Sequence, residues 1–415
     1  MSPVPLRSPE SLVKTEVVKR AVVLGDGLGA SIISLELADQ GFDVDRLMPG
    51  NEPMDLALYA FPSELSRNVA LVKMKSLSST PRIRLHRDCT VSSVAGSAGD
   101  FEVSFTEAKS KGIIKGGAVV LAQDPGLAAV DLGPTVVSNS EMRRMIEGDE
   151  TIPRVVVFIE GSGMTTACPA QGSTAFIENA LEIKRKRTDI QIYVLTKDIH
   201  APGAFERTYQ AAQASGIVFF RGDFSYRSSQ DEPNCMIIRD PVAGEVKIRP
   251  ELIVRDEAFD LGSNSNLARK LGLSVDREGR ILSINTRLHP GETIREGVFV
   301  CHGLGASILA SDNISEACAI ASSISELLSK DFLEHGAEVA FVDKEKCSAC
   351  LACVRICPYD APFIGEKGKA EIRIASCQGC GICVSLCPSK AIDQSNWTDA
   401  KMSAESEIAS KGASG

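Results

Sequence analysis

The sequence lacks the features of several large protein classes. No apolar run approaches the roughly 18 residues that span a bilayer, and the first residues contain no continuous apolar core of a secretory signal. Acidic residues outnumber basic ones by 54 to 45, which gives a net charge of -9 and argues against non-specific nucleic-acid binding. We therefore expect a cytoplasmic protein that does not itself insert into a membrane.

Familiar catalytic patterns are also missing. The five histidines fall in no metal-ligand or triad spacing, no G-x-S-x-G elbow is present, and no C-x-x-C pair lies outside the carboxyl-terminal region. We predict no catalytic residue and no substrate site of the chain's own. At about 150 residues per domain, the 415 residues predict two to three domains.

Cysteine is the most informative residue type. Eight of the 13 cysteines fall between Cys347 and Cys387, in the stretches CSACLACVRICP and CQGCGICVSLCP. Both read C-x2-C-x2-C-x3-C-P, the spacing of bacterial two-cluster ferredoxins. Zinc is the alternative, but zinc sites usually pair two C-x2-C hooks roughly 12–20 residues apart. Three hooks in immediate succession, followed by Cys-Pro, favour iron–sulfur clusters.

In this motif the fourth cysteine of each run ligates the cluster of the other run. The sequence therefore predicts two [4Fe-4S] clusters. The first has the ligands Cys347, Cys350, Cys353 and Cys387. The second has the ligands Cys377, Cys380, Cys383 and Cys357. Short strands are expected at 341–342 and 372–374, one before each cysteine run.

The remainder of the chain alternates strands with helices, which predicts an α/β fold with parallel sheets. The strand 21–24 runs into the turn Gly25-Asp-Gly-Leu-Gly-Ala30, followed by a helix at 31–40 and a strand at 42–47. This G-x-G-x-x-A turn is typical of a dinucleotide site. Gly25 would allow the tight turn, Gly27 the approach of a pyrophosphate, and Ala30 close packing of the helix. A glycine-rich turn that binds nothing is the alternative.

A second unit of the same kind is predicted from 154 onward. Its expected strands are 154–159, 191–195 and 216–220, and its helices are 173–186 and 204–215. Further strands are expected at 246–248, 252–254 and 298–301, and a helix at 313–329, whose start Ser311-Asp-Asn313 is rich in capping residues.

These elements divide the chain into five parts. They are an amino-terminal extension (1–18), a discontinuous FAD-type Rossmann domain (19–150 and 262–330), a second Rossmann-like domain (151–261), a small α+β 2[4Fe-4S] ferredoxin domain (336–395) and a flexible tail (396–415).

From about residue 20 to 392, the chain resembles the A subunit of heterodisulfide reductase. The likeness is carried by the stretches DIHAPGAFE (198–206), GIVFFRG (216–222), LARKLGL (267–273) and REGVF (295–299), together with the eight-cysteine region. The resemblance implies a thioredoxin-reductase-like flavoprotein body with appended ferredoxin modules. It also implies partners of the heterodisulfide-reductase B and C type, or a hydrogenase or dehydrogenase module.

Four positions depart from what the resemblance implies for a flavin site. The acid expected at the end of the second strand is replaced by Met48, and Asp43 and Asp45 come too early. The other three departures are Ala122-Gln123-Asp124, Asp256-Glu257-Ala258 and His302-Gly303. Together they predict that the flavin site has loosened or been abandoned.

The resemblance also implies an extra cluster in the second unit, for which only Cys168 remains. Glu160, Gly172 and Ser173 occupy the other ligand positions, so this cluster is expected to be absent. We interpret Cys168 as a buried small residue. The same interpretation applies to Cys89, Cys235, Cys301 and Cys318.

Two functional hypotheses follow. In the first, the chain is an electron-transfer subunit of a multi-subunit oxidoreductase, in anaerobic metabolism, with a body that serves mainly as a docking scaffold. In the second, FAD in the first unit exchanges electron pairs for single electrons, in the bifurcating manner that the resemblance implies. A non-redox assembly factor would leave eight well-spaced ligands unexplained.

Overall fold

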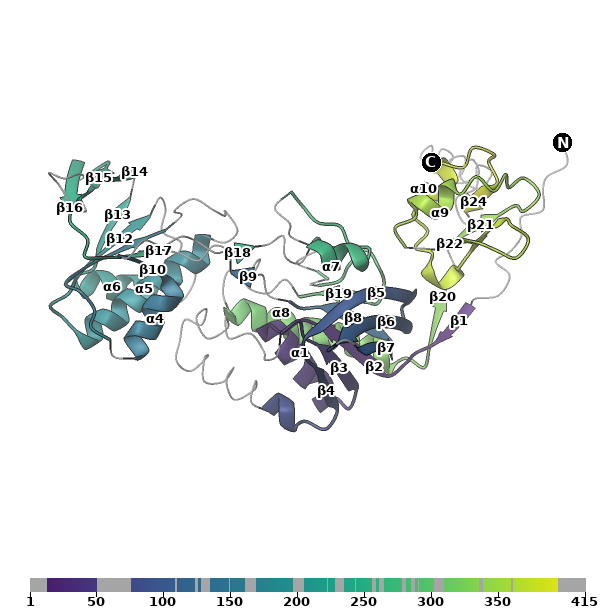
Figure 1. The fold of residues 1–415 in the computed structure, drawn as a ribbon, viewed down its shortest axis with the longest axis horizontal. Coiled ribbons are helices and arrows are strands. Elements are labelled where there is room, and N and C mark those ends of the chain that lie inside the picture. Colours follow the sequence, from purple (N-terminus) through teal and green to yellow (C-terminus); the bar gives the residue numbers. More distant parts are fainter. Residues whose placement is uncertain are drawn as a thin grey trace, which may run out of the picture.

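The computed structural model describes most of the chain. The described residues are 13–50, 76–108, 110–123, 126–127, 135–148, 150–160, 169–196, 205–221, 223–227, 235–242, 244–255, 259–260, 265–277, 281–284, 288–289, 291–301, 310–335, 339–359 and 361–394. Within them the chain forms three bodies, seen from left to right in Figure 1 as a second sheet unit, a first sheet unit and a small cysteine-rich module.

The first unit is built on a parallel sheet whose described strands run in the order β19-β8-β2-β3-β4. Their bounds are β2 (Arg20–Leu24), β3 (Asp43–Leu47), β4 (Ile83–His86), β8 (Ala118–Leu121) and β19 (Val298–Val300). The strands β2, β8 and β19 are short, mainly apolar runs, as is typical of sheets covered on both faces. The predicted strands 21–24, 42–47 and 298–301 are therefore confirmed to within two residues.

The two faces of this sheet carry different layers. Alternate residues such as Val23 and Val120 pack against helices α1 (Leu28–Asp39) and α8 (Ala310–Ser329). The residues between them, such as Val22 and Val119, pack against an antiparallel meander. This meander consists of β5 (Cys89–Ser97), β6 (Asp100–Glu107) and β7 (Ser110–Gly116).

The second unit repeats this arrangement. Its described strands pair in parallel in the order β10-β17-β11-β12-β13. One face packs on helices α4, α5 and α6, and the other on β15 and β16, which form an antiparallel sheet with β14. The bounds are β10 (Val136–Ser138), α4 (Asn139–Glu147), β11 (Val155–Ile159), α5 (Pro169–Lys186), β12 (Gln191–Thr196), α6 (Phe205–Ala214), β13 (Val218–Arg221), β14 (Asp223–Arg227), β15 (Cys235–Asp240), β16 (Gly244–Ile248) and β17 (Leu252–Arg255).

Three expectations about the two sheet units need correction. The strand near 246–248 is present as β16, but it pairs antiparallel and lies outside the parallel sheet. Helices α1, α5 and α8 each begin three or four residues earlier than predicted. Ser311 therefore lies in the first turn of α8 rather than before it, since helical backbone continues over capping-type residues when the fold packs the helix.

The cysteine-rich module contains two short antiparallel strand pairs and two helices of about one turn. Its elements are β21 (Ala340–Val342), α9 (Ala352–Ile356), β22 (Pro362–Ile364), β23 (Ala370–Ile372), the 3-10 turn η4 (Ile374–Ser376), α10 (Ile382–Ser385) and β24 (Ile392–Gln394). The first predicted strand is confirmed as β21. The second is wrong at its carboxyl end, because Ile374 lies in η4.

Two further pairings join distant parts of the chain. β1 (Val13–Glu16), within the expected amino-terminal extension, pairs antiparallel with β20 (Phe332–His335), which precedes the cysteine-rich module. β9 (Gly126–Leu127) pairs with β18 (Phe259–Asp260) where the chain passes between the two sheet units. No helix within the described ranges is long and apolar enough to cross a membrane.

Candidate metal centres

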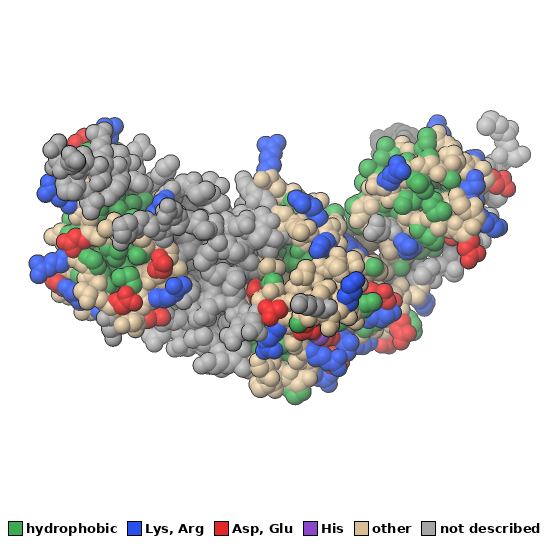
Figure 2. All heavy atoms as spheres, viewed as in Figure 1, with side chains coloured by type: hydrophobic (Ala, Val, Ile, Leu, Met, Phe, Trp, Pro, Cys, Tyr) green, Lys and Arg blue, Asp and Glu red, His purple; other side chains and the backbone are tan. Residues whose placement is uncertain are grey.

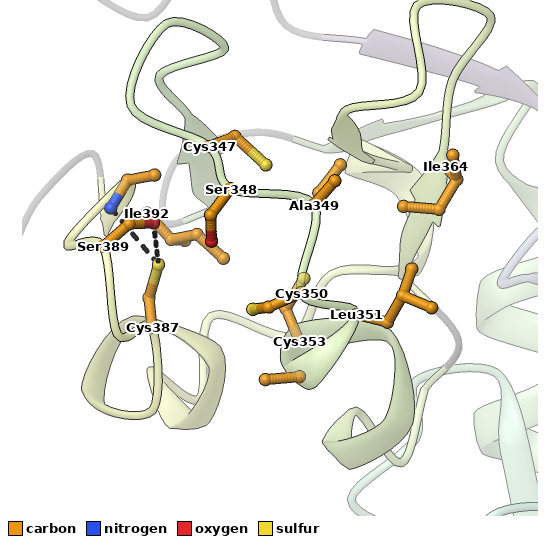
Figure 3. Close-up of a pocket in the computed structure, with 13 residues that line it drawn as sticks. Cys347, Ser348, Ala349, Cys350, Leu351, Cys353, Ile364, Cys387, Ser389 and Ile392 are labelled. Atoms are coloured by element: carbon orange, nitrogen blue, oxygen red, sulfur yellow. Dashed lines mark hydrogen bonds between the residues drawn. The ribbon is translucent and has the colours of Figure 1, made fainter.

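The first predicted cysteine set lies around one pocket of the module. Its four residues Cys347, Cys350, Cys353 and Cys387 line this pocket together with Ser389 and several apolar residues. Figure 3 shows Cys387 approaching from the opposite side to Cys347 and Cys350. The structure therefore brings together the four cysteines that the motif assigned to the first cluster, from both halves of the repeat.

Local backbone geometry explains how one short loop supplies three of these thiols. Ala349 and Leu351 have left-handed φ angles of 57° and 63°, which turn the loop sharply between the cysteines. Cys353 then enters α9, whose N-cap is Leu351. In the second run the matching positions are Gly379 and Gly381, with φ of 62° and 74°. Glycine adopts this conformation without strain, whereas a side chain costs on the order of 1 kcal/mol.

The second set is brought together as well. The thiols of Cys377, Cys357 and Cys380 all lie close enough to Cys383 to interact with it electrostatically. Burial, followed by these neighbouring thiols, raises the pKa of Cys383 to about 11. Cys357 thus sits with the cysteines of the second run, although it belongs to the first.

The protonation of these thiols bears on metal binding. Burial is the main cause that raises the pKa of Cys353 and Cys357. Burial also opposes ionisation of Cys387, but hydrogen bonds from Ser389 and from the Ala391 amide outweigh it and lower the pKa. Since iron binds the thiolate, loading of the buried cysteines must release protons.

Each set combines buried and exposed cysteines. Cys347, Cys353 and Cys383 are buried, while Cys350 and Cys380 are exposed. Among the residues that the structure describes, no three His, Cys, Asp or Glu side chains converge closely enough to hold a single metal ion. The cysteines of the first set instead line the wall of a hollow, as Figure 3 shows.

The glycine turn of the first unit has the expected backbone. Gly25 has φ of 141°, and a methyl group added to it would lie 2.3 Å from the carbonyl oxygen of Ala122. Gly27 is the N-cap of α1, and Ala30 is fully buried in the first turn of that helix. The turn thus fits the amino-terminal end of a helix against the end of β8, where a pyrophosphate would bind.

Two charged residues at this turn were not anticipated from the sequence. Arg46 is fully buried, and its guanidinium donates to the carbonyl oxygens of Gly25 and Gly27 and to Ser31 Oγ at 3.0, 3.2 and 3.0 Å. Asp26 is 6% exposed, and its Oδ1 has no hydrogen-bond partner in the described part of the chain. The strand of Arg46 reads DVDRL, and this mixed pattern carries no local signal that the arginine is buried.

Burial is the main cause that raises the pKa of Asp26, while its own backbone amide and the Arg46 guanidinium act in the opposite direction. A buried guanidinium beside the turn favours an anion there, whereas an ionised Asp26 would oppose one. The backbone of the turn is therefore compatible with binding of a phosphate group, but the Asp26 carboxylate disfavours it.

The acids near the end of the second strand are engaged elsewhere. Asp43 pairs with Arg82 at 3.2 Å, and Asp45 pairs with Arg20 at 3.2 Å and with His86 at 2.9 Å. Met48 follows the last residue of β3 and is fully buried, so the side chain at this strand end is apolar and not acidic. This supports the expected departure at Met48. Ala122 and Gln123 close against Gly25, while Asp124, 256–258 and 302–303 lie outside the described residues.

His86 lies in a cluster that makes stability depend on pH. Its pKa is raised, first by the hydrogen bond to Asp45, against the opposing effect of burial, and further by Glu107 at 3.4 Å. Because the folded-state pKa is above the unfolded value, the stabilisation is complete below about pH 6.5 and is lost as the pH rises through the folded-state pKa.

His86→Gln should therefore lower the free energy of unfolding by on the order of 1 kcal/mol at pH 6, and by less at pH 9. Urea unfolding of both proteins at the two pH values measures this difference. Arg20 and Glu107 are retained in both proteins and keep the remaining charges equal. The same difference at both pH values would show that the cluster does not titrate through His86.

The remaining predicted positions are only partly described. Glu160 is buried, and its Oε2 accepts a hydrogen bond from Thr196, so a carboxylate with a protein partner fills one position of the extra cluster. Cys168 lies outside the described residues, Gly172 lies in α5, and the side chain of Ser173 is not described. Cys89, Cys235 and Cys301 are buried, as expected, and Cys318 is partly exposed.

The module matches a family of known proteins. Residues 340–388 match the model of the 4Fe-4S dicluster domain. The iron–sulfur character that the cysteine spacing predicts is thereby confirmed.

Longer similarities extend into the body. A protein of Archaeoglobus profundus that is named as similar to the heterodisulfide reductase A subunit is 31% identical over 225 residues, which are 52% of this chain and 32% of that protein. The chain is similar to the A subunit of heterodisulfide reductase. The iron–sulfur A subunit of a CoB–CoM heterodisulfide reductase from Methanopyrus kandleri is 29% identical over 279 residues, 59% of this chain and 40% of that protein.

The resemblance predicted from the sequence is confirmed by these relatives. However, this chain spans less than half the length of these relatives, at 32% of the Archaeoglobus profundus protein and 40% of the Methanopyrus kandleri subunit. What those proteins do as whole subunits is therefore a matter for proposal here.

Solved structures show the fold of the body. Thioredoxin reductase from T. acidophilum superposes with a TM-score of 0.52 at 14% identity, covering 74% of this chain and 99% of its own. Thioredoxin reductase from Lactococcus lactis gives the same TM-score at 11% identity, with 75% and 99% covered. The predicted fold, two Rossmann-like units of thioredoxin-reductase type followed by a ferredoxin-like module, is confirmed.

Proposed function

We propose that this chain is an electron-transfer subunit of a cytoplasmic multi-subunit oxidoreductase of heterodisulfide-reductase type. Two [4Fe-4S] clusters would relay single electrons, and the body would serve mainly as a docking scaffold. The observation that carries the proposal is the sorting of eight cysteines into two sets. Cys387 lines the pocket of the first set, and Cys357 lies beside the thiols of the second set. The proposed ligands are Cys347, Cys350, Cys353 and Cys387 for one cluster, and Cys377, Cys380, Cys383 and Cys357 for the other.

A [4Fe-4S] cluster supplies reversible one-electron chemistry, and the protein sets its potential through hydrogen bonds to sulfur, burial and charge. Two such hydrogen bonds come from backbone amides. Ala340 N donates to Cys377 Sγ at 3.5 Å, and Ala391 N donates to Cys387 Sγ at 3.2 Å. Both amides lie in or beside the β21–β24 pair, which would hold them in place. One thiolate of each set would thus be stabilised by the small sheet.

Membership of a complex is supported by the surface of the module. Ile356, Ile382 and Leu386 are 44%, 39% and 50% exposed, although each lies in or beside a helix that carries cluster cysteines. Figure 2 shows apolar side chains over much of the module at the right. Apolar surface beside a redox centre suits a protein partner. The relatives are named as A subunits, which supports the presence of further subunits. The partners we propose are B- and C-type components, or a hydrogenase or dehydrogenase module.

We keep the predicted domain limits as part of the proposal: 1–18, 19–150 with 262–330, 151–261, 336–395 and 396–415. They are supported by the separate apolar cores of the two sheet units and of the module.

A second candidate is a flavin-bearing redox protein of the same complex type, with FAD at Gly25, Gly27 and Ala30. It is favoured by the intact turn and by the buried Arg46 beside it, and opposed by Met48 and by the buried Asp26. Gly27→Glu should strip any bound flavin while leaving iron untouched. If the body is only a scaffold, the substitution should change folding or complex assembly alone.

Anaerobic purification followed by iron, sulfide and acid-released flavin analysis of one sample tests the proposal. We expect about eight irons and about eight sulfides per chain, with little flavin. About eight irons with one FAD per chain would favour the second candidate. Iron far below four per chain in freshly isolated protein would contradict both.

A further inference from the structure

The turn that follows helix α7 (Ser265–Lys270) lies directly against the cluster module. Gly272 has φ of 73°, and a methyl group added to it would lie 2.8 Å from the carbonyl oxygen of Pro358. Pro358 follows Cys357, which lies with the second cysteine set. Only a residue without a side chain allows this approach of the two turns.

This turn is held in place by two cations of the body. Arg295 is 9% exposed, and its guanidinium donates to the carbonyl oxygens of Leu271 at 2.9 Å and of Gly96 at 3.0 Å, while lying 5.4 Å from the centre of the Phe101 ring. Lys270 Nζ donates to the carbonyl oxygen of Val91 at 2.6 Å. Both cations therefore tie the turn to strand β5.

Strand β5 itself forms a second contact with the module. It lies against η4, the turn that ends immediately before Cys377, and β1 contacts η4 as well. Cys377 and Cys357 both belong to the second set. Two separate contacts of the body thus fall beside cysteines of that set, and Arg295 joins the elements that make them.

We propose that Leu271, Gly272 and strand β5 form a docking site for the cluster module, which seats the second cysteine set against the body. Arg295 is its positioning residue, because its planar fork bonds both parts of the site at once. This proposal rests on the proposed function in taking the second set to hold a cluster. It assigns unlike environments to two clusters whose ligand loops have nearly the same sequence pattern.

The test compares the whole protein with Gly272→Ala, and uses Gly216→Ala as the matched control. Gly216 has φ of 83° but nothing within 4 Å of an added methyl group, so it carries similar backbone strain without a collision. Hydrogen exchange should rise several-fold in peptides over 356–359 and 374–377 of Gly272→Ala only. Arg295→Lys, which keeps the charge but not the fork, should raise the same exchange if Gly272→Ala folds poorly.

Electron paramagnetic resonance provides the cluster readout, with Cys350→Ser and Cys380→Ser assigning each signal to its set. At the potential where a wild-type cluster is half reduced, Gly272→Ala should change the ratio of reduced to oxidised second-set cluster at least three-fold. The ratio of reduced to oxidised first-set cluster should stay unchanged, because loss of docking exposes only the second set to additional water.

Unchanged exchange in both Gly272→Ala and Arg295→Lys would overturn the docking site, as would a response confined to the first set. Protein isolated without iron would instead contradict the proposed function. In that case hydrogen exchange still decides whether the turn of Gly272 docks the module.

Discussion

Cys353→Ser is expected to remove one cluster, so that iron falls from about eight to about four per chain. Cys353 is the least exposed, at 7%, of the three first-set cysteines that come from the first run. It lines the pocket that Cys387 also lines. A serine hydroxyl is a far weaker ligand than a thiolate for iron in such clusters, so one corner of the cluster would lose its anchor. Iron and sulfide analysis of anaerobically purified protein measures the effect.

The repeat supplies the matched experiment. Cys383→Ser changes the equivalent cysteine of the second run, which is 9% exposed, and should remove the other cluster. The double variant should hold almost no iron. Cys235→Ala serves as the control, because Cys235 is buried in β15 of the second unit, away from the module. Full iron in Cys353→Ser would refute the ligand assignment.

Gly25→Ala is expected to cost about 3 kcal/mol or more of folding stability. The added methyl group would lie 2.3 Å from the Ala122 carbonyl oxygen and 2.6 Å from the Gln123 amide nitrogen. Both are backbone atoms at the end of a central strand, so neither can move aside without disturbing the sheet. The φ of 141° adds strain for any residue with a side chain. Urea unfolding followed by circular dichroism measures the change.

Gly41→Ala is the control for this substitution. Gly41 also has a positive φ, of 94°, but nothing lies within 4 Å of the added methyl group. Its cost should be on the order of 1 kcal/mol. Equal losses in the two variants would show that backbone strain alone, rather than the contact with β8, requires glycine at position 25.

This result also bears on how the glycine turn is interpreted. The close approach of β8 requires Gly25 whether or not a dinucleotide binds. Gly25 therefore argues for the fold and leaves the cofactor open. Evidence for flavin has to come from Gly27 and Arg46, and evidence against it from Asp26, because these residues lie at the proposed position of a phosphate.

Much of the fold could be predicted because its signals are local. Short apolar runs before glycine turns indicated β2 and β11, and the helical periodicity after them indicated α1 and α5. The antiparallel meander β5–β7 was missed, since its strands are partly exposed and mix polar with apolar residues. The strand β16 was predicted near 246–248, but its antiparallel pairing was not, because its partner β15 was missed.

The charged residues of the glycine turn could not be placed from the sequence. Arg46 follows two aspartates that pair with other cations, and nothing local distinguishes it from an exposed arginine. Its bonds to Gly25 and Gly27 exist because β3 lies beside β2 in the parallel sheet. The burial of Asp26, whose Oδ1 has no hydrogen-bond partner among the described residues, likewise depends on other parts of the chain.

By itself, the sequence determined the iron–sulfur character of the module, because the spacing C-x2-C-x2-C-x3-C-P is local and typical of such clusters. It also determined the strand–turn–helix order of both sheet units, which follows from local hydrophobic patterns. Only the tertiary structure decided which cysteine set faces the body. That choice depends on long-range contacts, such as Gly272 with Pro358, 86 positions away, and Arg295 with Gly96, 199 positions away. The two ligand loops are nearly identical in pattern and carry no local signal that distinguishes them.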